Sequence, residues 1–361
     1  MLINIGFRWL RTFLLAIFAL GIWCFSAFPL LIERYYSSGF YVWFSSLLRL
    51  LQGNIPFSIG DILYAIAIVW LIKKAVTLII LLFNRRWNKK SFLNGLHKTI
   101  NRLLWLYIIF NVFWGLNYDR PGIAYQLKFE PAKYDTSILK RITADLLKKV
   151  NDYRLQVRDE QLVYPGNKEI FKSTAEAYEQ AQKQFPFLFY KNPSIKRSLF
   201  SEAGNYLGYL GYYNPISGEA QVNVKVPEFL IPYISCHEVA HQLGYASESE
   251  ANFVGYLAAK SSNNKLFNYS VYFDLFNYAN NELFYRDSMA ARANYKQLDT
   301  LVKLDIKAYR KYVHQYKNPI EPLVRIFYNN YLKANNQPKG IDSYNEVVAW
   351  LIAYQKKYGE I

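Results

Sequence analysis

The sequence has few cysteines and histidines, and its first third has almost no acidic residues. It contains two cysteines, Cys24 and Cys236, and four histidines among 361 residues. Neither cysteine lies where a disulfide is indicated, and each is expected to be a small buried apolar residue. Trp23 occupies the position where lipidation of Cys24 would require a small residue. A disulfide scaffold and a lipoprotein anchor are therefore excluded.

The shortage of acidic residues is concentrated near the N-terminus. The formal net charge is +16, and residues 1–118 contain 12 Lys and Arg but only 2 Asp and Glu. This excess of positive charge lies beside apolar stretches, where it orients membrane proteins. The charge therefore predicts contact with a lipid bilayer, and nucleic acid is not an expected partner.

Long apolar stretches predict three transmembrane helices, at about residues 10–32, 57–80 and 100–118. The first contains no charge from Phe13 to Ile32, although a cleaved signal peptide is an alternative interpretation. The second contains Asp61 near its start, and the third is short and rich in aromatic residues. Buried helices of a soluble core are the alternative for these two.

The distribution of basic residues predicts the orientation of the anchor. Between the second and third stretches lie Lys73, Lys74, Arg85, Arg86, Lys89, Lys90 and Lys98, whereas residues 33–58 hold only three charged side chains. The positive-inside rule places the N-terminus and the basic loop in the cytoplasm. The sequence thus predicts a multi-pass protein of the cytoplasmic (inner) membrane, with an anchor at residues 1–118 and an extracytoplasmic domain at residues 119–361.

The motif His237-Glu238-x-x-His241 dominates the second part of the chain. Two histidines four residues apart share one face of a helix, so both imidazoles can bind one metal ion. Glu238 lies one position round the helix, where its carboxylate can take a proton from a water held by zinc. Pro232 and Gly244 are suited to the start and end of this helix. The alternative is a pair of core histidines bonded to carbonyl groups or water.

A catalytic zinc needs a third protein ligand and one open position. Ser247 is a suitable N-cap for a following helix, on which Glu250 shares a stripe with Phe253, Val254 and Leu257. Because an unpaired carboxylate on such a face is costly, Glu250 is the predicted third ligand. A capping box with Ser247 is the alternative role for Glu250. Glu248, on a face that is expected to be less buried, is the second candidate for the third ligand.

Four segments around the motif resemble a known family: residues 211–215 (GYYNP), 218–223 (GEAQVN), 236–242 (CHEVAHQ) and 246–253 (ASESEANF). They are similar to an uncharacterised family of bacterial membrane proteins, with domain of unknown function 3810, over nearly the whole chain. The motif followed by a downstream glutamate also resembles the gluzincin metallopeptidases. The resemblance implies a zinc-peptidase-like site. It departs from the gluzincin pattern at Val254, where an aspartate that supports a histidine is usual.

The globular part is expected to be mainly α-helical (α+β), a zincin-like domain with a small antiparallel β region. Helical periodicity predicts helices at about 136–157, 174–184, 266–283, 288–316, 319–333 and 343–357. Strand-like runs occur at 199–200, 206–207 and 221–224, between turn residues. By resemblance, residues 219–224 would form an edge strand that holds an extended substrate.

These observations lead to one function and two alternatives. We expect a zinc-dependent metallopeptidase in which His237, His241 and Glu250 hold Zn²⁺ and Glu238 is the general base, with a peptide or protein as substrate. Tyr285, Arg286 and Tyr295 are candidates for stabilising an oxyanion. The alternatives are a non-catalytic membrane scaffold with a structural zinc and a transport subunit. Transport is disfavoured because Asp61 is nearly alone as a central ionisable residue in the spans.

Overall fold

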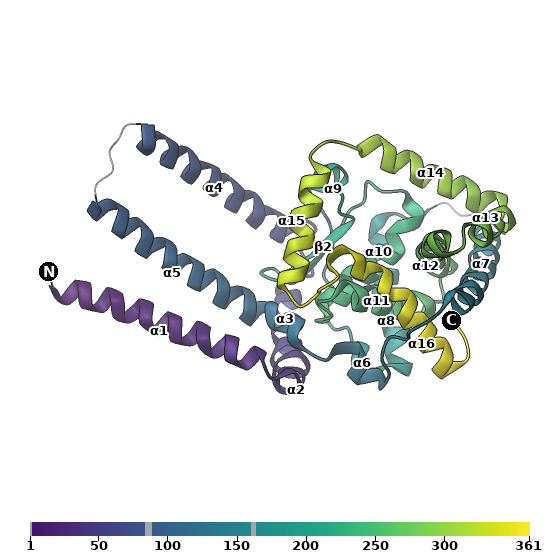
Figure 1. The fold of residues 1–361 in the computed structure, drawn as a ribbon, viewed down its shortest axis with the longest axis horizontal. Helices are drawn as coiled ribbons and strands as arrows, with labels where there is room; N and C mark the ends of the chain where they lie inside the picture. The colour runs from purple at the N-terminus through teal and green to yellow at the C-terminus, as the bar shows by residue number, and fades with distance from the viewer. Residues whose placement is uncertain (1, 84–88, 160–163) are drawn as a thin grey trace.

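The computed structural model describes residues 2–83, 89–159 and 164–361, and these residues are mostly helical. Arg85 and Arg86 of the predicted basic loop lie outside them. Three long helices project from one side of a globular part (Figure 1). They are α1 (Leu2–Ser26), α4 (Ile59–Phe83) and α5 (Lys89–Phe113).

Two stretches of the described residues are long and apolar enough to cross a membrane, Arg8–Ser26 in α1 and Ile59–Leu81 in α4. The third predicted span is not confirmed by this criterion. Its helix, α5, is long enough but carries polar side chains in its first half, including His97 and Asn101. It also ends at Phe113, after which the 3-10 helix η2 (Gly115–Asp119) packs into the globular part.

The polar residues of α5 contact α1. Oγ1 of Thr12 lies 2.9 Å from Nε2 of His97 and accepts a hydrogen bond from Asn101. The ring of Trp9 packs edge-on against the same imidazole. His97 is therefore part of the contact between α1 and α5. Cys24 differs from expectation because it is exposed on α1.

The segment between α1 and α4 is folded onto the globular part. It consists of α2 (Pro29–Leu31), the π-helix η1 (Ile32–Phe40) and α3 (Tyr41–Gln52). Buried side chains of this segment, Ile32, Tyr36 and Tyr41, form a small second core with Trp114 and Tyr213. The long helices α1 and α5 contribute Ala19, Ile22 and Ile108 to the same core, which therefore joins them to the globular part.

The globular part is built around three helices, α10 (Ile231–Gln242), α11 (Glu248–Ser261) and α12 (Lys265–Arg286), that pack against one another. The surrounding helices are α6 (Gly122–Leu127), α7 (Thr136–Asp159), α8 (Asn167–Gln184), α9 (Ser201–Leu207), α13 (Ser288–Gln297), α14 (Thr300–Tyr316), α15 (Glu321–Ala334) and α16 (Val347–Tyr358), with 3-10 turns η3 (Pro186–Leu188), η4 (Glu228–Leu230) and η5 (Gly340–Glu346).

Most of the predicted globular helices are confirmed, but the stretch 288–316 forms two helices. Asp299 separates them, because its side chain accepts a hydrogen bond from the backbone N–H of Leu301 and caps α14. Residues 343–346 of the last predicted helix belong to the 3-10 turn η5, and α16 begins at Val347.

The sheet has three strands in the order β1-β3-β2: β1 (Ile195–Arg197), β2 (Gly211–Asn214) and β3 (Glu219–Val222). β3 pairs parallel with β1 and antiparallel with β2, so the sheet is mixed and the expected antiparallel arrangement is wrong. Residues 206–207 belong to α9, part of the connection between β1 and β2. The predicted edge strand at 219–224 is the central strand, and β2 lies at an edge.

A buried carboxylate joins the sheet to the start of α4. Glu219 of β3 accepts hydrogen bonds from the backbone N–H groups of Ile59 and Gly60, the second at 2.6 Å, and from the hydroxyls of Ser58 and Ser217. A carboxylate at a helix N-terminus satisfies the free N–H groups and interacts favourably with the helix dipole. Glu219 is fully buried, and its amide and hydroxyl donors take the place of water.

Removing this carboxylate should destabilise the whole fold. We expect Glu219→Ala to lower the free energy of unfolding by about 2–4 kcal/mol, because several buried donors lose their acceptor. The measurement is the thermal unfolding of the purified full chain in one detergent. Glu176→Ala, at an exposed glutamate of α8, is the control and should change stability by less than about 0.5 kcal/mol. Equal midpoints for the two variants would contradict the assignment.

Candidate metal centre

Helix α10 brings the two motif histidines together. Pro232 lies in its first turn, and the helix ends before Gly244, whose φ of 88° is the left-handed conformation that glycine favours. The imidazole rings of His237 and His241 have centroids 4.7 Å apart. The predicted helix, its ends and the shared face of the two histidines are all confirmed.

The carboxylate that approaches these histidines belongs to Glu248, at the start of α11. Its Oε2 atom lies 3.2 Å from Nε2 of His237 and 3.5 Å from Nε2 of His241. Ligand atoms of the three residues all lie within 4.8 Å of one another. Two imidazoles and one carboxylate are a donor set that zinc uses in catalytic sites.

Glu250, the predicted third ligand, lies elsewhere. Its Oε1 atom accepts a hydrogen bond of 2.7 Å from the backbone N–H of Ile123. Burial raises the pKa of Glu250 to about 7, although the charge of Arg120 acts in the opposite direction. Ser247 caps α11 as expected, through a hydrogen bond from the backbone N–H of Glu250.

The packing of α11 against α10 explains why Glu248, and not Glu250, approaches the two histidines. The side of α11 that contains Glu248, Ala251 and Gly255 is buried, whereas the sequence predicts it to be the less buried side. A Cβ atom on Gly255 would lie 3.1 Å from the backbone nitrogen of His237, so only a very small residue allows this approach. Small side chains on this face indicate close packing, and the packing directs Glu248 toward the imidazoles.

The orientation of His241 fits a bound cation. Its Nδ1 atom lies 2.8 Å from the carbonyl oxygen of Tyr245, so this nitrogen carries the proton and donates it. In a neutral ring, Nε2 then presents a lone pair to the carboxylate of Glu248. A lone pair and a carboxylate oxygen repel each other at this distance unless a proton or a cation lies between them. Without a metal ion a proton takes this place, because burial acts to lower the pKa of His241 but the carboxylate of Glu248 raises it to about 9. A divalent metal ion bound by the three residues can replace that proton.

Two further observations concern the charges of Glu248 and of a neighbouring aspartate, Asp274. Burial acts to raise the pKa of Glu248, but the adjacent histidines hold it well below its usual range, so this residue is a carboxylate. Asp274 of α12 interacts electrostatically with His237, and burial raises the pKa of Asp274 to about 7. In the gluzincin pattern an aspartate that supports a histidine stands at the position of Val254 on α11. Here the aspartate that interacts with a motif histidine is Asp274, which lies on α12.

The side chain of Glu238 projects from α10 toward the edge strand β2. It is buried, and a Cβ atom on Gly211 would come within 2.5 Å of its Oε1 atom. Burial raises the pKa of Glu238 to about 7, against the effect of the charges of His237 and His241. A carboxylate with this pKa can both accept and release a proton near neutral pH.

Sequence reasoning missed the tyrosine that contacts the centre. The hydroxyl of Tyr328, on α15, donates a hydrogen bond of 2.5 Å to Oε1 of Glu248. The ring of Trp114 also packs edge-on against His241. Both lie far from the motif in sequence, so no local signal identifies them.

The residues proposed to stabilise an oxyanion lie outside this group. Tyr285 is 89% exposed, Arg286 forms an ion pair with Glu282, and Tyr295 lies beneath the guanidinium of Arg310. His314, the remaining histidine, is exposed on α14. Cys236 is buried, which confirms the prediction for this cysteine.

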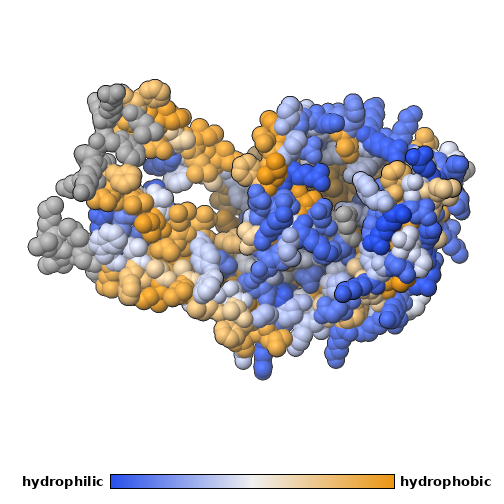
Figure 2. All heavy atoms as spheres, viewed as in Figure 1, coloured by the Kyte–Doolittle hydropathy of each residue, from blue (hydrophilic) through white to orange (hydrophobic). Residues whose placement is uncertain are grey.

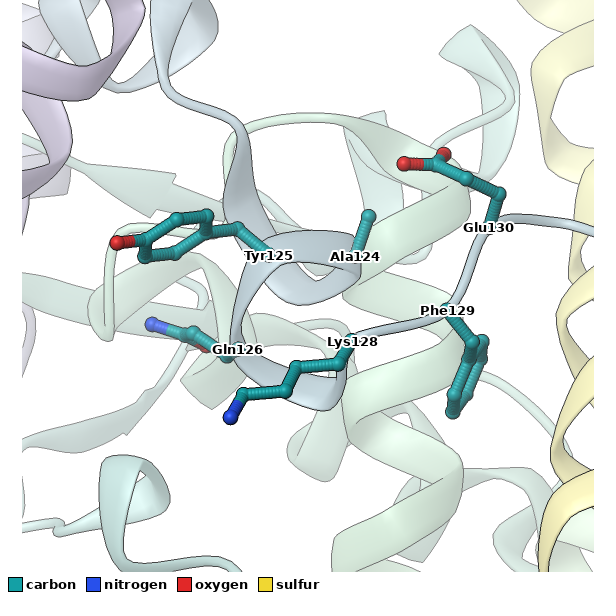
Figure 3. A pocket seen from close by; sticks show the side chains of 6 residues that line it. All are labelled: Ala124, Tyr125, Gln126, Lys128, Phe129 and Glu130. Atoms are coloured by element: carbon teal, nitrogen blue, oxygen red, sulfur yellow. The ribbon is translucent and has the colours of Figure 1, made fainter.

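A separate surface cavity of about 630 Å³ lies beside α6. Figure 3 shows its lining side chains, which come from α6 and the segment that follows it: Ala124, Tyr125, Gln126, Lys128, Phe129 and Glu130. None of His237, His241 and Glu248 lines it. The cavity is therefore distinct from the candidate centre.

The identity of the third ligand can be tested with two matched substitutions. We expect Glu248→Gln to reduce the zinc content of the purified full chain by about tenfold or more, because the carboxylate charge is lost. Glu250→Gln keeps the acceptor for Ile123 and should retain the zinc content of the wild type. The measurement is elemental analysis after mild purification. The reverse pattern would restore Glu250 as the ligand.

The hydrogen bond from Tyr328 should contribute to metal affinity. We expect Tyr328→Phe to weaken zinc binding about tenfold, because the carboxylate of Glu248 loses the donor that orients it. Competition with a coloured chelator measures the affinity. Tyr285→Phe removes an exposed hydroxyl and is the matched control. An unchanged affinity in the Tyr328 variant would show that this contact does not position the ligand.

Comparison with known proteins gives one family and no further relative. Neither the curated proteins nor the solved structures contain a match. A family model described as "Protein of unknown function (DUF3810)" matches residues 36–352, which include α3, α4, α5, the sheet and the candidate metal centre. The chain therefore belongs to this family.

Proposed function

We propose that the chain is a membrane-anchored, zinc-dependent metallopeptidase that hydrolyses peptide bonds at the cell envelope. The observation that carries this proposal is the convergence of His237, His241 and Glu248, with Glu238 next to the first histidine on the same helix. Three protein ligands leave one position open on a tetrahedral ion, as in catalytic sites, whereas structural zinc sites use four.

Zinc in such a site lowers the pKa of a water molecule and polarises the scissile carbonyl group. The chain supplies the proton transfers. Glu238 takes a proton from the attacking water and returns it to the nitrogen of the leaving amine. Its pKa near 7 suits both steps, because the carboxyl group can exist in either form at neutral pH.

The edge strand β2 is suited to hold a substrate. It pairs with β3 on one side only, and Gly211 at its start lies directly against Glu238. An extended peptide can add to such an edge through main-chain hydrogen bonds. This role, assigned from resemblance to residues 219–224, moves in our proposal to residues 211–214.

We also propose that α5 is a third membrane span. Its polar side chains His97 and Asn101 contact α1, so that they are covered by protein. The opposite side presents exposed apolar residues, among them Leu96, Leu103 and Leu106. A helix with this arrangement can cross a bilayer as part of a helix bundle even though its mean hydropathy is only moderate. The basic residues around the end of α4 and the start of α5 support a cytoplasmic location for this end of the helices, with the globular part on the outer side.

The role of Glu238 gives the direct test of hydrolysis. We expect Glu238→Gln to keep its zinc but to lower peptide hydrolysis by about 10²–10⁴-fold, since the amide cannot accept the proton. Glu228→Gln, at an exposed residue just before α10, is the control and should keep full activity. The measurement is cleavage of a diverse peptide library by the full chain in detergent.

Two results would contradict the proposal. Retained turnover in Glu238→Gln would remove this residue from the reaction. Zinc that is present but does not bind a hydroxamate, together with no cleavage by the wild type, would instead support a structural zinc in a membrane scaffold.

A further inference from the structure

Helix α3 has the reverse of the usual amphipathic arrangement. Its buried side contains the polar residues Ser45 and Arg49 together with Tyr41, and Arg49 is only 2% exposed. Its outward side is apolar and consists of Val42, Trp43, Leu47, Leu50 and Leu51. A surface helix in water normally has its charged residues outside and its apolar residues inside. The outward side of α3 is therefore not built to face water.

Hydrogen bonds fix α3 in this orientation. The guanidinium of Arg49 donates to the carbonyl oxygen of Lys191 at 3.1 Å, to Oγ of Ser45 at 3.0 Å and to the carbonyl oxygen of Gln242 at 3.3 Å. The hydroxyl of Tyr41 donates to the same carbonyl of Gln242 at 3.2 Å. Rotation of the helix would break these bonds and expose a buried charge. The apolar side thus stays on the surface.

The apolar surface continues on both sides of α3 along the chain. Phe28, Leu30 and Leu31 precede it and are exposed, and Phe57 follows it. Residues 28–57 contain three charged side chains, of which Glu33 and Arg49 are buried and only Arg34 is exposed. In Figure 2 the hydrophobic surface of the long helices extends onto the adjoining edge of the globular part.

We propose that residues 28–57 dock on the lipid bilayer and lie in its interfacial layer. The candidate spans α1 and α4 enter this segment from both ends, at Ser26 and Ile59, so it lies where they leave the membrane. With 12 residues, α3 is about 18 Å long, too short to cross the hydrocarbon core but suited to lie along the surface. Trp43 on the outward side is a residue type favoured at this depth.

The docked segment would fix the position of the candidate metal centre. Its inner residues Tyr41 and Arg49 bind the carbonyl of Gln242, the residue after His241. The centre is therefore held one helix away from the bilayer. If the proposed peptidase function is correct, its substrates are polypeptide segments presented close to the membrane surface. The docking itself does not depend on that function.

Spin labels in the full chain can test the docking. The exposed Cys24 is replaced by alanine, while the buried Cys236 is retained, and the labelling of this background measures its contribution. Single cysteines are then introduced as Trp43→Cys and Leu51→Cys, at outward positions of α3. Met289→Cys is the matched control, because this side chain is 82% exposed on α13, far from the anchor (Figure 1).

The labelled proteins are reconstituted in phosphatidylcholine and phosphatidylglycerol vesicles. Power saturation compares collisions with oxygen, which is enriched in the bilayer, and with a water-soluble nickel complex. We expect the ratio of oxygen to nickel collisions to be several-fold higher at positions 43 and 51 than at position 289. Equal ratios at the three positions would overturn the proposal.

A second copy of the chain on this face would also overturn it. In that case the labels would be protected from both reagents and broadened by spin–spin interaction. Because the labels report docking without hydrolysis, failure of the docking and failure of the proposed function give different results. The zinc content of the same samples shows whether the metal centre is intact.

Discussion

The C-terminal end of α10 is held by side chains of α3 and by Arg120, and the position of the candidate centre depends on this. Helices leave their last carbonyl groups without internal partners. Tyr41 and Arg49 donate to the carbonyl of Gln242, and Arg120 donates to that of Gly244 at 3.2 Å. Arg120 in turn forms a buried ion pair of 2.7 Å with Glu33 of η1. Segments next to the anchor thus fix the end of the helix that carries His241.

Close packing by glycine positions the acidic residues of the centre. Gly255 lets α11 approach α10, which brings Glu248 to the imidazoles, and Gly211 lets β2 approach Glu238. In both cases a Cβ atom would occupy space that backbone or carboxylate atoms already fill. The geometry of the centre therefore depends on residues without side chains as much as on the ligands themselves.

These contacts explain how much the sequence could predict. The helix with His237 and His241 follows from local spacing, and its terminating glycine is a local signal as well. The choice between Glu248 and Glu250 depends on which face of α11 meets α10. Small residues on that face are ambiguous, because they suit both close packing and solvent exposure. The contribution of Tyr328 depends on the path of the chain over 80 residues, for which periodicity gives no information.

The anchor shows a related limit. Composition identifies α1 and α4, which contain long apolar stretches. It does not identify α5, whose polar residues have partners only in the folded chain. The boundary expected at residue 118 also crosses hydrogen bonds that join Glu219 to the start of α4 and Gln242 to α3. The family model begins at residue 36, inside η1, and so includes these contacts while it leaves out α1. The matched region thus contains both the candidate metal centre and the segment α3 that holds the end of α10.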